Sequence, residues 1–475
     1  MGRREPGGPF DAAVVGSGPN GLVAAVRLAR AGRKVVVYEA HEHPGGAAQT
    51  AALTLPGFRH DPFSAVHPLG VGSPAFRALV PEIDWVHPAA PLGHARDGRP
   101  AAVLHRSFAD TAATLDGDGP AWAGLFGPLV HGFEGLVADG LGPPRWPSHP
   151  RTLLAMGLRA MFSASSLARR AFRGDAAQAL FAGLAAHSVL PLARVPSAAV
   201  GLVLGAAGHA VGWPSPRGGA GAITDALVQA LLAAGGALRL GVRIADWAEV
   251  ETGGPVLFDL VPRAVVAATG DALPASERAR LLGFRHGPGA CKVDWALDGP
   301  IPWRDPTLAG CGTVHLGGGL AEIEESEAAV WEGRVSPRPT LLVGQQSVAD
   351  PTRAPPGQHT AWGYLHTPPG DPRDHSAAIE AEIERQAPGF RDRIRARFVR
   401  TAPAFAAWNP SWVDGDIVGG AADWDQLLSR PVLRLRPYRT AHPRIWLCGA
   451  STPPGAGVHG LCGWHAAGAV LTAGG

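Results

Sequence analysis

The first forty residues alternate between short apolar runs and one helical pattern. Residues 10–15 are mostly apolar and stop at a glycine-rich segment, residues 16–21. Residues 22–30 carry apolar side chains at helical spacing, and residues 34–38 form a second apolar run. The pattern predicts a strand, a glycine turn, a helix and a second strand, which together begin a parallel α/β sheet.

The glycine turn suits the phosphates of a dinucleotide. Gly16 permits a tight turn, Gly18 lets the backbone approach a pyrophosphate, and Gly21 lets the helix pack close to the strand. The helix N-terminus offers unpaired N–H groups and a partial positive charge. Glu39 ends the second strand, where it can accept hydrogen bonds from the ribose hydroxyls of an adenosine. The neighbouring residues expected to contact the dinucleotide are Ser17, Pro19, Asn20 and Ala40.

A second glycine pair, Gly45-Gly46, follows directly. It suits a loop that wraps the pyrophosphate again, which simple NAD enzymes do not need. The pattern resembles the flavoprotein superfamily of glutathione-reductase-like and amine-oxidase-like enzymes, which bind FAD in this way. The resemblance implies further FAD contacts at Gly45, Gly46, Ala47 and Thr50.

Other segments narrow the resemblance. Residues 56–61, 216–223 and 447–460 are similar to motifs of the phytoene desaturase-type oxidoreductases, and residues 409–410 and 415–420 match a phytoene dehydrogenase-like branch. The resemblance spans nearly the whole chain, and its specificity lies in the N-terminal and C-terminal motifs. It implies FAD and a redox fold, but it does not imply phytoene as the substrate.

The C-terminal motif is a predicted strand (444–448), a glycine-rich turn and a helix (463–470). Such a turn presents backbone N–H groups to the flavin ring and the ribityl chain. Many relatives carry an acidic residue after the first glycine of this motif. Here Ala450-Ser451 stand there, so the ribityl contact is either Ser451 or backbone alone. The expected contacts are Gly449, Ala450, Ser451, Gly457, Val458 and His459.

The rest of the predicted FAD domain comes from the middle of the chain. A helix (222–232) precedes a short strand (237–242), and in the family the residue at the position of Val242 binds adenine through its backbone. Residues 263–270 are expected to complete the parallel sheet, which adds Gly270 to the cofactor contacts. The prediction is an α/β fold with a discontinuous Rossmann-like FAD-binding domain (1–75, 205–274 and 431–475) and an α+β substrate domain (76–204 and 275–430), the latter with an antiparallel sheet and a helical part.

The two insertions differ in pattern. Residues 76–204 are expected to be mostly helical, with one basic amphipathic helix over 153–172. That helix could rest on a membrane surface, although a solvated face of a packed helix is the favoured interpretation. In the second insertion, residues 291–297 and 359–366 are predicted antiparallel strands. A sheet set against a dinucleotide domain would form a pocket at the interface.

Lys292 is a candidate catalytic residue on one of these strands. It resembles the lysine that amine oxidases place near flavin N5 through a water molecule. Asp294, on the same strand face, offers an ordinary ion pair, and this structural interpretation is slightly favoured.

Two histidines are further catalytic candidates. His459 lies in the flavin-facing turn and is equally suited to a proton relay or to packing. His67 follows the segment that approaches the flavin in this family, although a loop role is favoured.

Other residues have competing structural roles. Trp362, Tyr364 and His366 share one strand face, where they line either a substrate pocket or, as favoured, the core. Asp416 either touches the cofactor or, as is usual, holds its own glycine turn.

Composition and short sequence features exclude several other classes of protein. The chain has 475 residues, is 46% hydrophobic and carries a formal net charge of +2, which excludes a disordered chain and gives no field for nucleic acid. Its four cysteines form no CxxC pair, so we expect no disulfide scaffold, no metal site and a cytoplasmic location. Arg3-Arg4 is not interpreted as an export signal, and the apolar run 198–213 is too short to span a membrane.

The function expected from these observations is an FAD-dependent oxidoreductase of the desaturase, dehydrogenase or oxidase type. It would remove two hydrogens from a hydrophobic small molecule, with hydride passing to flavin N5. Only one dinucleotide fingerprint is present, so reoxidation would use oxygen, a quinone or a diffusible partner. The alternatives are a redox-neutral isomerase or cyclase and a non-catalytic lipid binder that resembles the Rab escort and dissociation-inhibitor proteins.

Overall fold

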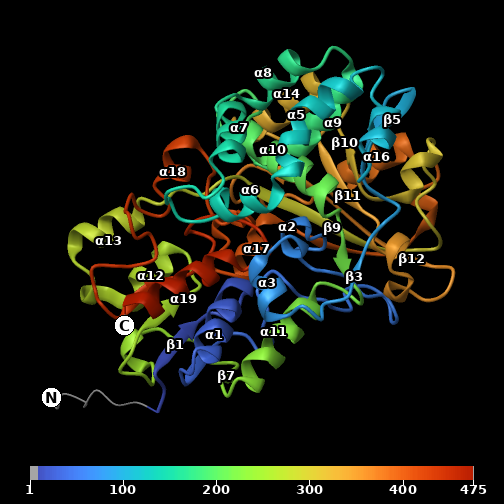
Figure 1. Ribbon diagram of the computed structural model, residues 1–475. Coiled ribbons are helices and arrows are strands. Elements are labelled where there is room, and N and C mark those ends of the chain that lie inside the picture. Colours follow the sequence, from blue (N-terminus) through green and yellow to red (C-terminus); the bar gives the residue numbers. More distant parts are fainter. Residues whose placement is uncertain (1–8, 474–475) are drawn as a thin grey trace.

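Figure 1 shows the computed structural model of the chain, which describes residues 9–473. Its first sheet has the strand order β14-β8-β1-β2-β7, and every neighbouring pair is parallel. The strands are β1 (Ala12–Val15), β2 (Val35–Tyr38), β7 (Ala237–Arg239), β8 (Val256–Phe258) and β14 (Ile445–Leu447). Three distant parts of the chain therefore build this sheet, which confirms the discontinuous Rossmann-like fold.

Helices cover both faces of the parallel sheet. On one face, Val14 and Val37 join a core that includes α1 (Pro19–Arg30), and α1 in turn contacts α11 (Gly221–Ala233) and α19 (Leu461–Ala473) (Figure 1). On the other face, the alternate strand residues pack against α12 (Pro262–Thr269) and α13 (Ala275–Leu282). Both faces of the sheet are buried, and all of its strands except the edge strand β7 are continuous apolar runs.

The strand predicted over residues 263–270 is wrong, because this segment is the helix α12. Pro262 starts the helix, where its fixed φ and missing N–H are tolerated. Gly270 follows it with φ +48°, a conformation that favours glycine. The sheet strand is β8, a few residues earlier, and an apolar run alone did not distinguish the two.

The second sheet has seven strands in the order β13-β9-β12-β11-β10-β4-β5. The predicted pair β9 and β12 is antiparallel, but β10 and β4 are parallel, so the sheet is mixed. Two of its strands come from the first insertion, whose other elements are mostly helices, as expected. Those strands are β4 (Ala90–Arg96) and β5 (Arg99–Leu104), and the others are β9 (Gly289–Leu297), β10 (Cys311–Leu316), β11 (Leu341–Gly344), β12 (His359–Thr367) and β13 (Ile394–Arg400).

The helical part lies beside this second sheet, in the upper half of Figure 1. The apolar run 198–213 is largely the helix α10 (Ser197–Ala210), which packs against α5 (Gly119–His131) and α9 (Asp175–Ala186). The single helix predicted over 153–172 is two helices, α7 (Pro150–Ala160) and α8 (Ala164–Ala171), because Ser163 caps the second.

The remaining α-helices and strands complete the fold. They are α2 (Pro68–Val71), α3 (Pro74–Leu79), β3 (Trp85–Val86), α4 (Phe108–Ala112), α6 (Phe133–Gly140), β6 (Ser215–Pro216), α14 (Leu320–Trp331), α15 (Gln346–Ala349), α16 (Ser376–Gln386), α17 (Ala402–Trp408) and α18 (Trp424–Leu428). No helix within residues 9–473 is long and apolar enough to cross a membrane. Arg3-Arg4 lies outside the described residues, and the exact domain boundaries stay a prediction.

Candidate active site

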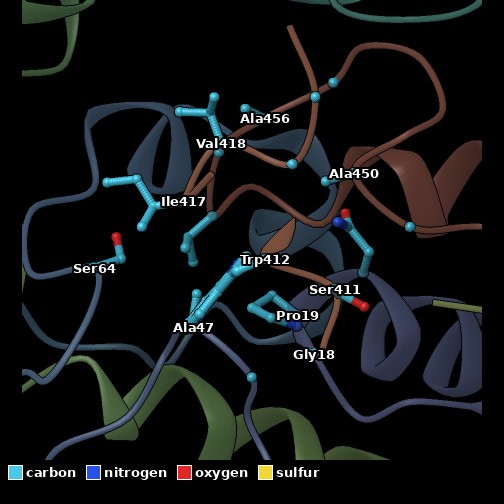
Figure 2. A pocket seen from close by; sticks show the side chains of 18 of the residues that line it. Gly18, Pro19, Ala47, Ser64, Ser411, Trp412, Ile417, Val418, Ala450 and Ala456 are labelled. Atoms are coloured by element: carbon cyan, nitrogen blue, oxygen red, sulfur yellow. The ribbon is translucent and has the colours of Figure 1, made fainter. Parts of the chain in front are cut away.

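One large cavity of about 990 Å³ extends from the carboxyl end of β1 to the second sheet. Figure 2 shows Gly18 and Pro19 on one side of it, Ala450 and Ala456 on another, and Trp412 reaching into it. Its volume is at the upper end of the ~300–1,000 Å³ typical of ligand pockets. Within residues 9–473, no cluster of His, Cys, Asp or Glu is arranged to hold a metal ion.

The two glycine loops meet closely beneath the cavity. Gly16 has φ +99°, which favours glycine, and a Cβ on Gly46 would lie 3.0 Å from the Cα of Gly18. The backbone nitrogen of Gly45 donates to the Ser17 carbonyl oxygen at 3.0 Å, so the second loop is fastened to the first. This cradle of bare backbone at a helix N-terminus fits a pyrophosphate.

Asp259, at the end of β8, is a cavity residue that the sequence analysis missed. Its Oδ2 accepts a hydrogen bond from the Gly21 nitrogen at 2.9 Å. A Cβ on Gly18 would lie 2.6 Å from the same oxygen. Burial, and secondarily the charge of Glu39, raises the pKa of Asp259 to about 7, although the Gly21 N–H opposes the shift. The misplaced strand is the reason Asp259 was overlooked.

Glu39 lies at the end of β2, as predicted, and lines the cavity. Its Oε2 accepts from both the backbone nitrogen (2.9 Å) and the hydroxyl (2.6 Å) of Ser17, and its Oε1 accepts from the His41 nitrogen at 2.9 Å. A carboxylate has about four acceptor positions, so capacity for one ribose hydroxyl is left. Val242 is tethered beside it, because its nitrogen donates to the Glu39 carbonyl oxygen.

Most of the predicted cofactor residues line the cavity, but some do not. Thr50 Oγ1 donates to Asp61 and accepts from the Gly221 nitrogen, so it holds loops together behind the cavity. Gly270 lies beyond α12, which corrects its assignment as a cofactor contact. The predicted residues on the cavity wall are Gly16, Ser17, Gly18, Pro19, Asn20, Glu39, Ala40, Gly46, Ala47, Val242, Gly449, Ala450, Ser451, Gly457 and Val458. Those absent from the wall are Gly21, Gly45, Thr50, Gly270 and His459.

The C-terminal turn brings one unpaired polar atom to the cavity. Ser451 Oγ is buried and has no hydrogen-bond partner among the described residues. A buried hydroxyl without a partner costs free energy, so a ligand atom at this place would relieve that cost. Together with the glycine cradle and Glu39, Ser451 makes the residues of this cavity fit FAD.

His459 is turned away from the cavity, contrary to the expectation of a flavin contact. Its Nδ1 accepts from the Leu461 nitrogen at 3.0 Å, and its Nε2 bonds the Ala456 carbonyl oxygen at 3.3 Å. Burial lowers the pKa of His459 to about 4. Both ring nitrogens serve the turn, which corresponds to the packing interpretation.

Lys292 lines the cavity and also has the ion pair expected from Asp294. Its Nζ lies 2.5 Å from Asp294 Oδ1 and 3.0 Å from the Asp61 carbonyl oxygen, and 5.7 Å from the ring centre of Trp362. Burial lowers the pKa of Lys292, although Asp294 opposes the shift. A buried ammonium held by a carboxylate at the cavity wall is suited to both structural and catalytic use.

His67 lines the cavity beside Ser64, whose hydroxyl lies 3.1 Å from its Nε2. Its Nδ1 is buried without a partner among the described residues. Burial lowers the pKa of His67 to about 4, so the ring is neutral near neutral pH. His67 and Lys292 share the same cavity, whereas His459 does not.

Aromatic side chains that were not predicted form another wall. Phe63 packs against Trp408 (ring centres 4.2 Å apart), and Trp408 stacks on Trp412 at 5.5 Å. All three line the cavity (Figure 2 labels Trp412). They come from loops and the end of α17, where no periodic pattern indicates them.

The four remaining candidates from the sequence have different positions in the structure. Trp362 and Tyr364 line the cavity, but His366 points to Glu327, whose Oε2 lies 2.8 Å from its Nδ1. Asp416 accepts from backbone nitrogens of its own glycine turn, including Gly420 at 2.7 Å, which is the structural role considered usual.

Comparison with known proteins agrees with this architecture. Residues 14–81 match the family of NAD(P)-binding Rossmann-like domains. A phytoene dehydrogenase of Streptomyces griseus is 28% identical over 443 residues, which cover 83% of this chain and 79% of that protein. The mouse pyridine nucleotide-disulfide oxidoreductase domain-containing protein 2 is 33% identical over 147 residues, covering 28% of this chain and 25% of that protein.

Solved structures share the fold over nearly the full length. An oxidoreductase from Methanosarcina mazei superposes with a TM-score of 0.65 at 18% identity, covering 97% of this chain and 99% of that one. Putrescine oxidase gives 0.62 at 16% identity, covering 98% of both chains. Cyclohexylamine oxidase from Brevibacterium oxydans gives 0.59 at 14% identity, covering 98% and 99%. The chain is therefore similar to a phytoene dehydrogenase over most of its length and shares the fold of the flavin amine oxidases, which supports an FAD-dependent oxidoreductase.

Proposed function

We propose that the protein dehydrogenates an apolar small molecule. The observation that carries this proposal is the lining of the cavity beyond the cofactor cradle, where apolar side chains from α6, α7 and α10 gather. These are Leu136, Leu153, Met156, Val200, Val203 and Leu204. Such a lining favours an apolar ligand, because each apolar area removed from water is stabilising.

The residues proposed to hold FAD follow from the cradle. Backbone groups of Gly16–Asn20 and Gly46 would bind the pyrophosphate, Glu39 the adenosine ribose, and Ser451 with its turn the ribityl chain. When bound, FAD supplies a hydride acceptor at N5. The protein positions the substrate C–H bond against that atom and keeps water out with the aromatic wall of Phe63, Trp408 and Trp412.

Lys292 and His67 are the proposed catalytic groups. Lys292 Nζ, held by Asp294 and the Asp61 carbonyl oxygen, would hold a water molecule or a proton at the cavity wall. The neutral His67 ring, with a free Nδ1, would accept or donate a hydrogen bond there. His459, whose nitrogens serve its own turn, would act only by fixing that turn.

The reduced flavin would pass its electrons to oxygen, a quinone or a diffusible partner, because the chain has one dinucleotide fingerprint and that one is assigned to FAD. A location in the cytoplasm is proposed from the four cysteines, all free and buried.

A peripheral membrane contact is also proposed, at helix α7. Leu153 and Met156 of α7 line the cavity, whereas Leu154 and Leu158 face outward and are each 63% exposed. Residues 140–174 contain six arginines and no Asp or Glu. An exposed apolar helix face with a basic flank suits an anionic lipid surface, from which an apolar substrate would enter.

The test is an anaerobic titration of the purified flavoprotein with polyenes, isoprenoids, hydrophobic alcohols and amines. Bleaching of the flavin absorbance by an apolar class supports the proposal, and bleaching by polar amines alone would refute it. Product formed without net flavin reduction would favour the redox-neutral isomerase or cyclase. Tight lipid binding by a protein purified without flavin would favour the lipid binder.

A further inference from the structure

The apolar part of the cavity has one polar corner. His187, at the end of α9, lies beside Trp213, with ring centres 6.1 Å apart. Trp213 Nε1 donates to Thr313 Oγ1 at 3.1 Å, and all three residues line the cavity. Thr313 lies opposite Gly344 in the neighbouring strand, and Gly344 lies opposite Trp362 in the next one. Four polar side chains, from the end of α9, the loop after α10, β10 and β12, therefore line this part of the cavity wall.

Trp362 brings an unpaired donor to this corner. The side chain is 6% exposed, and its Nε1 has no hydrogen-bond partner among the described residues. The indole lies over Gly344 and fills the space that a Cβ would take there, so it extends from its own strand toward the strand of Thr313. A buried N–H without an acceptor is destabilising, so the cavity is prepared for an acceptor atom from a ligand.

His187 brings the complementary group. Its Nε2 lies 3.2 Å from Nε2 of His315, and it has no other side-chain partner within residues 9–473, so its Nδ1 is open to a ligand. Burial lowers the pKa of His187 to about 3, so the ring is neutral and can accept a hydrogen bond. The charge that acts on His187 is that of another histidine, His366. The Lys292 ammonium, 5.7 Å from the ring centre of Trp362, is already paired with Asp294, so the pair leaves no net charge to match an ionised ligand.

We propose that this corner is a subsite for a hydroxyl group on an otherwise apolar substrate, with the ligand oxygen accepting from Trp362 Nε1 and the ligand O–H donating to His187 Nδ1. The inference rests on the proposed function and narrows its substrate class from apolar molecules to apolar alcohols. Thr313, whose Oγ1 already accepts from Trp213, can turn its own proton toward the same oxygen.

Three ligands with the same decyl chain distinguish the hydrogen bond from Trp362 Nε1 from the hydrogen bond to His187 Nδ1. 1-Decanol keeps both the acceptor and the donor, decyl methyl ether keeps only the acceptor, and decane has neither. Their dissociation constants are measured on the purified flavoprotein through the perturbation of its flavin absorbance. We expect affinity to fall from alcohol to ether to alkane, by about 2- to 10-fold at each step, the range for one net hydrogen bond.

The variants assign each step to one residue. Trp362→Phe is expected to reduce the difference in affinity between ether and alkane, because only the Thr313 hydroxyl is left to donate to the oxygen. His187→Phe is expected to abolish the difference between alcohol and ether. The control Val203→Ala, in the apolar lining, changes all three constants together and keeps their ratios. Equal binding of the three ligands by the natural protein, or unchanged ratios in both variants, overturns the subsite. Absence of binding by all three overturns the proposed apolar function together with the subsite.

Discussion

Asp259 and Gly21 join the end of β8 in the Rossmann sheet to α1: the carboxylate Oδ2 accepts the Gly21 N–H at 2.9 Å. This carboxylate lies at the edge of the cradle proposed for the pyrophosphate, close to Gly16, Gly18 and Gly449. A neutral carboxyl group at that place is compatible with the phosphates, whereas an ionised one repels them.

FAD affinity is therefore expected to depend on the ionisation of Asp259. The pKa of Asp259 in the folded protein is about 7, above the ordinary 3.8, so ionisation of this group opposes folding. Its contribution to the free energy of unfolding therefore falls as the pH rises from about 3.8 to about 7. If bound FAD raises the pKa by one further unit, affinity falls about 10-fold from below pH 7 to above pH 8. Asp259→Asn should give a flat profile. Fluorescence titration of FAD into apoprotein measures both, and a flat profile in the natural protein would contradict the prediction.

Gly18→Val should abolish FAD retention. A Cβ at Gly18 would come within 2.6 Å of Asp259 Oδ2, and the rest of the side chain would enter the proposed pyrophosphate space. The flavin-to-protein ratio after gel filtration measures the effect. Gly124→Ala is the matched control, because its Cβ meets nothing within 4 Å in helix α5, and it should retain the flavin. Full occupancy in Gly18→Val would refute the phosphate assignment.

Lys292→Met should keep FAD bound but slow flavin reduction or reoxidation. Loss of the ammonium leaves Asp294 buried without its charged partner, so the free energy of unfolding should also fall by about 3–5 kcal/mol. Stopped-flow measurement of the two half-reactions separates the roles. The double variant with Asp294→Asn should recover stability but not rate. Unchanged half-reaction rates would show that Lys292 has only the structural role of its ion pair with Asp294.

Leu154→Glu combined with Leu158→Glu should weaken binding to vesicles that contain an anionic lipid. Each substitution adds a negative charge to the exposed apolar face of α7 and removes buried area from the lipid contact. Leu232→Glu is the control, because Leu232 is 48% exposed and belongs to α11, which lies far from α7 in Figure 1. Co-sedimentation with the vesicles measures the binding. Equal sedimentation of the natural protein and the double variant would contradict the proposed membrane contact.

The sequence was sufficient to predict the residues of the cofactor cradle, but not the residues that line the substrate part of the cavity. Gly16, Gly18 and Glu39 belong to a local unit in which each residue type has a fixed task, and the structure places all three on the cavity wall. Residues 263–270 were misjudged because a short apolar run is compatible with either a helix or a strand until Pro262 is weighed.

The missed cavity residues share a different cause. Trp408, Trp412 and Trp213 lie at element ends or in loops, and only the tertiary arrangement brings them to one wall. His459 illustrates the opposite case, since a motif places a residue near the cavity but does not determine which way its side chain turns.

The packing of α19 on α1 has a consequence for how the protein is made. Gly463 leaves no room for a side chain against the Asn20 backbone, and β14 forms the edge of the sheet begun by β1. On the ribosome, α1 gains its packing partner α19 only after residues 461–473 have been translated. Flavin capture is therefore expected only after residues 445–473 have been made, and nascent chains that stall before residue 445 are expected to lack flavin and to depend on chaperones.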